Sequence, residues 1–554
     1  MALIPTPAHS SSEFLPKLVT ILREGYRPAD LRADALAGLT VAIVALPLSM
    51  AIAIASGVSP ERGLFTTIIG GFIVSLMGGS RFQIGGPAGA FIVLVSACVA
   101  AIGVEGLLLA TLMSGVFLAV LAALRAGSYV RFIPYPVTVG FTAGIAVIIF
   151  ASQIKDLLGL TLPGAEPAEI VQKVEVLWAA RGSLNPAALL VAAGTVALIV
   201  GVKRWAPRAP NLLIAVALAS VVVAVMGLPV ETIYSRFGEL PRGPPAPALP
   251  DFGLEAVQAA LPWALSFTLL GAIESLLSAV VADGMSGRRH RPNAELMAQG
   301  VANVVTPLFG GFCVTGTIAR TATNVRAGSR GPVSGMLHAL FVLAFMLVAA
   351  PLAGFIPLAA LAGVLAVVAW NMAEKEELWH LARHSRADAV VLLATFGLVV
   401  FRDLTEGIVV GFALAGLVFI NRMSAGTTIA ESRLPMSEMD LDRDGDNDVV
   451  VYHLNGPWFF GAAARLGSVL DQVSERPRAL VVDFAAVPLI DSSGAYSFAL
   501  LARKMARKEG RLVISGASAE VRRVLHQAGV RGELVLFVPD LDAVPAALGA
   551  QQTL

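Results

Sequence analysis

The amino-acid sequence predicts a polytopic α-helical membrane protein with a small soluble α/β domain at its C-terminal end. Hydrophobic residues make up 56% of the 554 positions, and the mean hydropathy is +0.76. Charged residues make up only 14%, against about 25% in an average soluble protein. They are also unevenly spread, because residues 423–554 hold 29 of the 79 charged side chains in 132 positions. We therefore expect a membrane part over residues 33–425, a linker over 426–447 and a soluble domain over 448–554.

Composition argues against several classes of protein. The formal net charge is +1, so nothing indicates a nucleic-acid partner. The two cysteines, Cys98 and Cys313, both lie in apolar stretches and are too few for a disulfide framework. An HExxH, a GxSxG and a P-loop sequence are all absent, and the seven histidines are scattered. We therefore expect a protein that is not an enzyme and that holds no cofactor or metal.

A window of about 20 apolar residues predicts fourteen membrane spans. A Pro-rich polar gap at 228–256 divides them into seven and seven. The predicted spans lie near 36–56, 64–78, 84–101, 105–124, 134–152, 185–202, 211–227, 257–283, 294–309, 312–325, 332–350, 356–371, 387–401 and 405–422.

Loop charges predict the orientation of these spans. With the N-terminal segment 1–32 on the inside, the inner segments hold 19 Lys and Arg residues and the outer segments hold seven. This agrees with the positive-inside rule. Both termini are therefore expected to be cytoplasmic.

Two spans are interrupted by glycine-rich segments at corresponding places. Residues 78–91 precede the third span of the first seven, and residues 310–321 precede the third span of the second seven. Short spans broken by Gly or Pro at matching positions are typical of an inverted-repeat transporter with its binding site at the break. The alternative is that these glycines form only tight turns or close helix contacts.

Such breaks could bind a small anion. Half-helices that begin near Ala88 and Ala319 would present free backbone N–H groups and a partial positive charge. Arg320 adds a full positive charge at the second break, although it could instead reach the membrane surface. Phe91 could line the pocket, or it could pack against other apolar side chains of the core.

Glu274 is the other isolated charge within a predicted span. Its carboxylate indicates either a proton or cation site or an ion-pair partner for Arg320. Ser278 lies four residues further on and shares its helix face. Asp283 and Glu295 lie nearer the cytoplasmic edge, where we expect solvated loop charges.

Several long motifs in fixed order resemble the SulP family of anion transporters, over nearly the whole chain. They are Leu36–Ala42 followed by Ala45–Ala51, Gly57 through Leu64, Gly78–Arg81 running into Gly86–Ala88, Gly271–Leu277, Asp283–Met285, Asn293, Glu295–Leu296, Gln299–Gly300, Ala319–Thr321, Asn324 and Ala327–Gly328.

This resemblance implies a seven-plus-seven inverted repeat with a core and a gate domain, transport by an elevator-like movement, a homodimer and a location in the bacterial plasma membrane. It also implies a set of residues around the anion, contributed by spans one, three, eight and ten. Carried over by motif, they are Ser49, Met50, Ile52, Ala88, Gly89, Ala90, Phe91, Glu274, Ser278, Gly316, Thr317, Ala319 and Arg320.

The cargo implied by the resemblance is a C4-dicarboxylate, sulfate or bicarbonate. The segments Leu270–Glu274, Trp370–Met372 and Gly456–Phe460 look closest to a bacterial dicarboxylate branch. Sodium-coupled bicarbonate members carry Asp where Glu274 stands, so proton coupling or anion exchange is expected instead of sodium coupling. An anion channel, or a sensor or motor that does not transport, is the alternative on the same fold.

The C-terminal part alternates strand-like and helix-like patterns, which predicts a small α/β sheet covered by helices. The expected elements are strands over 449–454, 479–484 and 512–515 and helices over 461–474, 492–508 and 518–528. The turn Leu489–Gly494 resembles the loop of STAS domains, in which the serine after the aspartate is phosphorylated in bacillary regulators. Ser492 is therefore a candidate regulatory site, unless Asp491 and Ser492 merely cap the helix. Such a domain would serve dimer contacts or a cytoplasmic regulator.

Overall fold

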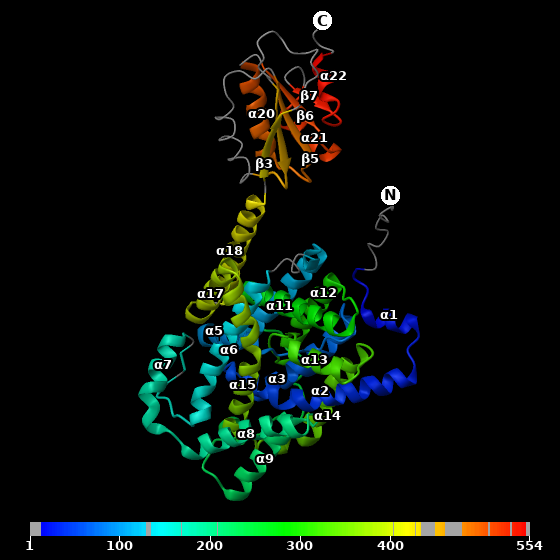
Figure 1. Ribbon diagram of the computed structural model, residues 1–554. Coiled ribbons are helices and arrows are strands. Elements are labelled where there is room, and N and C mark those ends of the chain that lie inside the picture. Colours follow the sequence, from blue (N-terminus) through cyan, green and yellow to red (C-terminus); the bar gives the residue numbers. More distant parts are fainter. Residues whose placement is uncertain are drawn as a thin grey trace. The chain divides into compact units, whose positions relative to one another are not determined.

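The structure is a computed structural model that divides into two compact units, residues Met1–Phe412 and Ala413–Leu554 (Figure 1). The described residues are 13–128, 134–164, 166–167, 169–207, 209–402, 404–426, 428–433, 449–459, 479–507, 510–531 and 535–549.

The first unit is almost entirely helical. Its elements are α1 (Lys17–Glu24), α2 (Pro28–Ala55), α3 (Pro60–Phe65), η1 (Thr66–Gly70), α4 (Gly71–Met77), β1 (Gly85–Gly86), η2 (Gly89–Phe91), α5 (Ile92–Ala123), α6 (Tyr135–Leu158), α7 (Ile170–Ala179), η4 (Ala180–Ser183), α8 (Pro186–Trp205), α9 (Asn211–Met226), α10 (Ile233–Phe237), α11 (Leu254–Ser286), α12 (Pro292–Val305), η5 (Thr306–Phe309), β2 (Thr315–Gly316), α13 (Ile318–Arg326), α14 (Val333–Ala353), α15 (Leu358–Met372), α16 (Lys375–His384) and α17 (Arg386–Phe401). Helix α18 (Leu404–Ala425) begins in this unit and ends in the second.

A multi-pass membrane fold is confirmed, whereas the number of spans stays a prediction. Within the described residues, eight helices are long and apolar enough to cross a membrane. The predicted spans 84–101 and 105–124 correspond to two helical stretches on either side of Gly103, within the range Ile92–Ala123 that is labelled α5. Gly103 has a φ of 72°, a conformation that glycine adopts without strain. The predicted break before span ten leaves a short helix, α13, of nine residues.

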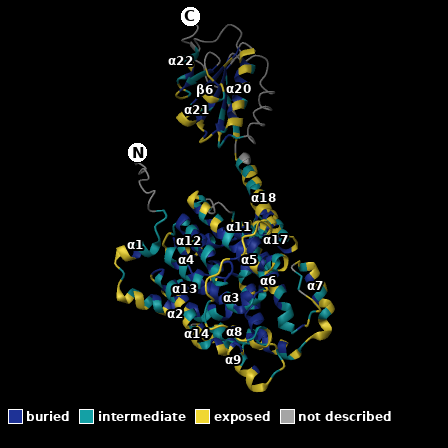
Figure 2. Ribbon diagram, turned by 180° about the vertical axis from the view of Figure 1, so that it is seen from behind, coloured by how far each residue is buried: buried dark blue, intermediate teal, exposed yellow. Residues whose placement is uncertain are grey.

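Helices from the two halves of the chain pack into two groups. In the first group, α5 packs on α11 and α12, α2 packs on α13 and α14, and α4 packs on α12 and α14. In the second group, α6 packs on α15 and α17, and α8 packs on α9 and α15. The two groups meet where α2 contacts α9 and α15 and where η2 contacts α6. Buried residues concentrate in the middle of the unit around α3, while α9 has one exposed face (Figure 2).

The described N-terminal segment, residues 13–24, crosses the first helix group. Glu24 pairs with Arg81 at 2.7 Å. Arg291 donates from Nη1 to a backbone carbonyl and a hydroxyl of this segment, both at 2.8 Å. Burial lowers the pKa of the Lys17 ammonium, and the nearby positive charges of Arg291 and Arg81 lower that pKa further. Through Glu24 and Arg291, the segment links the loop after α4, which holds Arg81, to the loop after α11, which holds Arg291.

The second unit is a five-stranded sheet with helices, as the alternating pattern predicted. Its strands run in the order β3-β4-β5-β6-β7, with β3 antiparallel to β4 and the others parallel. The elements are β3 (Thr428–Arg433), β4 (Val449–Asn455), β5 (Ala479–Ala486), α20 (Ser492–Arg507), β6 (Arg511–Ser515), α21 (Ala519–Gln527), β7 (Val535–Val538) and α22 (Val544–Gly549). The helix predicted over 461–474 lies outside the described residues.

Strand β3 lies within the range 426–447 that the sequence suggested as a linker. Side-chain hydrogen bonds across three neighbouring strands hold this edge strand in place. Ser432 Oγ lies 2.8 Å from His453 Nε2, and His453 Nδ1 lies 3.1 Å from Asp483 Oδ2. Pairing with β4 was not foreseen because the two strands are separated by a long polar segment.

Candidate functional site

The two glycine-rich breaks come together in the middle of the first helix group. Strand β1 pairs with β2 in antiparallel fashion, with Gly85 opposite Gly316 and Gly86 opposite Thr315. Thr317 adds two hydrogen bonds to the carbonyl of Ile84, from its backbone N at 2.9 Å and from Oγ1 at 3.1 Å. Segments more than 200 residues apart thus form one short ribbon.

A helix begins directly after each strand of this ribbon. Ala88 precedes η2 and Thr317 precedes α13, each with an extended backbone conformation, and neither side chain caps its helix. The first backbone N–H groups of both helices therefore have no side-chain cap, an arrangement suited to an anion. Gly89 is partly exposed and Ala319 is exposed. The two helix starts are consequently open to a small ligand.

Arg320 lies in the first turn of α13 and is 1% exposed. Its Nη2 donates to Ser49 Oγ at 3.0 Å and to the carbonyl of Pro87 at 3.4 Å, and its Nη1 donates to Thr67 Oγ1 at 3.4 Å. Its Nε has no hydrogen-bond partner. Among the described residues, no carboxylate lies within ion-pair distance of this guanidinium. A buried charge without a counter-charge is costly, so the site favours the arrival of an anion.

Thr67 is a second polar contact of this site, and no motif in the sequence points to it. Its Oγ1 lies 2.8 Å from Ser49 Oγ and donates to the carbonyl of Gly63 at 3.0 Å. Thr67 belongs to η1, a π-helical turn inside the second predicted span. Such turns occur often at functional sites because they re-aim a side chain. The two consecutive threonines within an apolar span were the available signal.

Glu274 lies on α11 beside the second break and is 6% exposed. Gly271, one turn before it, accepts a hydrogen bond from Thr315 Oγ1 at 3.3 Å. Ser278, one turn after it, donates to Thr321 Oγ1 at 3.2 Å. Within the described residues the carboxylate itself makes no hydrogen bond or ion pair. The alternative that Glu274 is paired with Arg320 is therefore wrong for this structure.

Glu295 is not the solvated loop charge that the sequence suggested, because it is fully buried. Its Oε2 accepts hydrogen bonds from the backbone N–H groups of Gly79 at 2.8 Å and Ser80 at 3.0 Å. Its Oε1 accepts from Gln83 Nε2 at 3.0 Å and Gln299 Nε2 at 3.3 Å. Four donors in an apolar interior stabilise the carboxylate. Glu295 thus holds the segment that leads into β1.

Asp283 is half-buried, and its partner is a histidine. Its Oδ2 accepts from the backbone N of His290 at 3.0 Å and lies 2.7 Å from His290 Nδ1. It therefore closes the turn between α11 and α12 instead of standing free in solvent.

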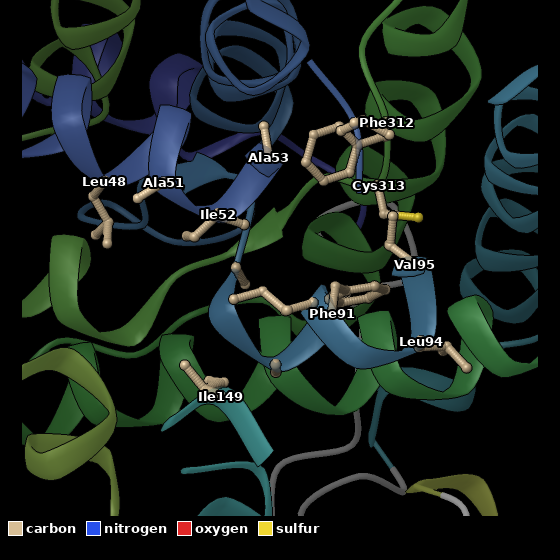
Figure 3. Close-up of a cluster of buried hydrophobic side chains, with 14 of the residues drawn as sticks. Leu48, Ala51, Ile52, Ala53, Phe91, Leu94, Val95, Ile149, Phe312 and Cys313 are labelled. Atoms are coloured by element: carbon tan, nitrogen blue, oxygen red, sulfur yellow. The ribbon is translucent and has the colours of Figure 1, made fainter. Parts of the chain in front are cut away.

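Other residues proposed for the site lie around the start of η2. Figure 3 shows Phe91 among buried apolar side chains that include Ile52 of α2, Ile149 of α6 and Phe312. The rings of Phe91 and Phe267 lie 6.0 Å apart, and Ala90 is buried. A Cβ on Gly89 would lie 3.2 Å from Ile149 and 3.7 Å from Met372 of the second helix group. Phe91 therefore packs against buried apolar side chains. Ile149 and Met372 of the second group form one side of the site.

Met50 does not join this cluster of polar groups. It lines a separate apolar cavity between α2, α9 and α14. Met50 follows Ser49 on the same helix, and a step of one residue turns the side chain by about 100°. The two neighbours therefore face different surroundings.

Ser492 is exposed at the first position of α20 in the second unit. Asp491 Oδ1 accepts a hydrogen bond from the backbone N of Gly494 at 2.7 Å. This contact is the helix-capping interaction that the sequence predicted as the alternative to a regulatory role of this turn.

A metal site finds no support among the described residues, which hold no group of three or more His, Cys, Asp or Glu side chains that could bind one ion.

Known proteins resemble this chain over most of its length. Residues 31–395 match the Sulfate permease family and residues 440–543 match the STAS domain. The putative sulfate transporter YvdB of Bacillus subtilis is 42% identical over 517 residues, which cover 92% of this chain and 95% of that protein. The bicarbonate transporter BicA of Picosynechococcus is 31% identical over 517 residues, covering 90% and 91%.

Solved structures share the fold. The transmembrane domain of a cyanobacterial BicA superposes with a TM-score of 0.64 at 32% identity, covering 69% of this chain and 98% of that one. Murine Solute Carrier 26 family member A9 in its inward-facing state gives a TM-score of 0.85 at 19% identity, covering 99% and 96%. The chain therefore belongs to the sulfate permease (SulP) family of membrane anion transporters and carries a C-terminal STAS domain.

Proposed function

We propose that this protein is a secondary active transporter that carries a small oxyanion across the bacterial plasma membrane. The observation that carries the proposal is Arg320, a buried guanidinium beside two uncapped helix starts and without a carboxylate partner in the described part of the chain. The anion would take the free N–H groups at Gly89 and Ala319 together with the charge of Arg320. Ser49, Thr67 and Thr317 would fix the ribbon and the guanidinium around it.

We further propose an elevator-like movement of the first helix group against the second. The division of the helices into two groups supports this, because the anion site belongs to the first group while Ile149 and Met372 of the second group stand against Gly89. A site that moves with one group past an apolar surface would be exposed to each side of the membrane in turn. Residues 33–425 would form this transport domain.

Similar proteins are named as a putative sulfate transporter and a bicarbonate transporter, and the dicarboxylate-like segments add succinate as a third candidate. The deciding experiment is uptake of labelled sulfate, bicarbonate and succinate into proteoliposomes, with and without an inward proton gradient. Saturable uptake of one anion with counterflow supports a carrier. Net current that scarcely saturates with anion concentration would instead indicate an anion channel.

Glu274 is the proposed coupling group, since it is a buried carboxylate without a partner among the described residues. In proton symport the anion and a proton on Glu274 would cross together, so uptake should rise as the outside is acidified. We expect Glu274→Gln, which resembles the protonated form, to transport without this pH dependence. Flux against outside pH checks this, with Glu255→Gln at the exposed start of α11 as the matched control. If Glu274→Gln keeps the pH dependence of the unmodified protein, Glu274 is not the coupling group.

Gly86 tests whether the position of Arg320 matters for binding. A Cβ on Gly86 would overlap Arg320 Nη1, so Gly86→Ala should displace the guanidinium. A hydrogen bond to a charged group is worth about 1.5–3 kcal/mol, so loss of one such contact to the anion should lower its affinity by about tenfold to a hundredfold. Binding of labelled anion to purified protein measures it. Gly194→Ala, where a Cβ meets no atom within 4 Å, should bind normally, and equal affinities in both variants would contradict the assigned geometry.

The remaining proposals concern arrangement and regulation. The excess of Lys and Arg in the inner segments supports cytoplasmic termini. Residues 448–554 would then be a cytoplasmic domain for dimer contacts or regulation, and the exposed hydroxyl of Ser492 is accessible to a modifying enzyme. A phosphate there would lie at the start of α20, where the helix dipole favours it.

A further inference from the structure

An apolar cavity of about 550 Å³ lies between α2, α9 and α14. Neither Arg320 nor Glu274 lines it. Ser220 is the only polar residue among those that do, and its hydroxyl already donates to the carbonyl of Val216 at 2.8 Å. The cavity therefore offers no group that would hold an anion or ordered water.

The cavity is a slot that runs along α9. Its lining residues on α9 recur at helical spacing on one face, from Leu213 to Ala224. These two residues are eleven positions apart, which corresponds to about 16 Å. The hydrocarbon core of a bilayer is about 30 Å thick, so one leaflet is about 15 Å deep. The slot thus has the length of one leaflet.

The slot is also continuous with the surface that faces the bilayer. Val221 of α9 and Leu352 of α14 line the cavity, yet they are 58% and 69% exposed. Helix α14 is long and apolar enough to cross a membrane and α9 is a shorter apolar helix, so we expect their exposed faces to meet lipid hydrocarbon and not water. Length, apolar lining and lateral opening all fit a single extended hydrocarbon chain better than a compact ligand.

We propose that this slot binds one acyl chain of a bilayer phospholipid. The chain lies between the two helix groups, because α2 and α14 belong to the first and α9 to the second. Met50 contacts it, while the preceding residue, Ser49, holds Arg320. The lipid site goes beyond the proposed transport function, since binding of the chain requires no transport.

The test is the number of phospholipids that stay on the purified protein in detergent, counted by native mass spectrometry. A chain held in the slot resists detergent exchange, whereas lipid on the outer surface is removed. We expect one retained phospholipid per chain in the unmodified protein. Ala217→Leu with Ala349→Leu fills the slot from two sides and should lose it. Ala193→Leu with Ala197→Leu, at exposed positions of α8, adds the same atoms elsewhere and should retain it.

Equal retention in both double variants, or none in the unmodified protein, overturns the proposal. Should the slot-filling pair fail to fold, Ala217→Leu alone is examined with a phospholipid that carries a photoreactive group on its acyl chain. Crosslinks to Met346 and Ser220, reduced in that variant, support the site, and crosslinks that are unchanged overturn it. Failure of anion uptake with normal lipid retention would instead reject the transport function and leave the lipid site standing.

Discussion

Replacing Arg320 by alanine is expected to abolish measurable anion binding, with a loss of at least about thirtyfold. The guanidinium is 1% exposed and donates to Ser49, Thr67 and the carbonyl of Pro87. Removing one partner of a buried, hydrogen-bonded charge pair costs about 2–5 kcal/mol, and here the bound anion would be the partner left alone. Binding of labelled sulfate, bicarbonate or succinate to purified protein measures the loss.

Two further variants separate charge from geometry. Arg320→Lys keeps the charge but loses the planar guanidinium that contacts two helices at once. We therefore expect it to bind the anion more tightly than Arg320→Ala but more weakly than the unmodified protein. Arg326→Ala removes an exposed charge from the last turn of the same helix and should bind normally. Unchanged affinity in folded Arg320→Ala would remove Arg320 from the site.

Replacing Glu295 by alanine is expected to produce the largest loss of stability. Its carboxylate accepts four hydrogen bonds in a fully buried place. Without it, the N–H groups of Gly79 and Ser80 and the amide of Gln299 lose their acceptor, and each buried donor left alone costs about 1–3 kcal/mol. The apparent melting temperature in detergent should fall by about 5 °C or more.

Glu295→Gln tests whether charge is needed in addition to shape. In this variant one carboxylate oxygen becomes an NH₂ group that must face a donor. The melting temperature should therefore fall by most of the amount expected for Glu295→Ala. Glu105→Ala, at an exposed position of α5, removes a carboxylate that has no such donors and should melt normally. Equal melting temperatures for Glu295→Ala and Glu105→Ala would contradict the structural role of Glu295.

Much of the fold follows from local properties of the sequence. Long apolar segments without charges can be stable only in a membrane, and alternating strand and helix patterns predict the second unit. The breaks were visible because glycine and proline weaken a helix wherever they stand. Arg320 and Glu274 stood out for a similar reason, since isolated charges are rare within apolar spans.

Partners across the chain could not be predicted in this way. Glu295 looked like a loop charge because its donors at Gly79, Ser80 and Gln83 come from a segment over 200 residues earlier. Thr67 looked like any threonine in a span, and only the π-turn aims it at Ser49. The strand β3 was hidden in a polar stretch because its pairing depends on β4.

By itself, the sequence determined that the chain crosses a membrane, where its spans break and which charges lie within them, because each of these depends on neighbouring residues. Tertiary structure alone decided that the two breaks pair as one ribbon, that Arg320 has no carboxylate partner in the described part of the chain, and that Glu274 stands apart from it. It also decided that Met50 faces an apolar slot. These outcomes depend on which segments distant in sequence pack together, and this packing cannot be predicted from local composition.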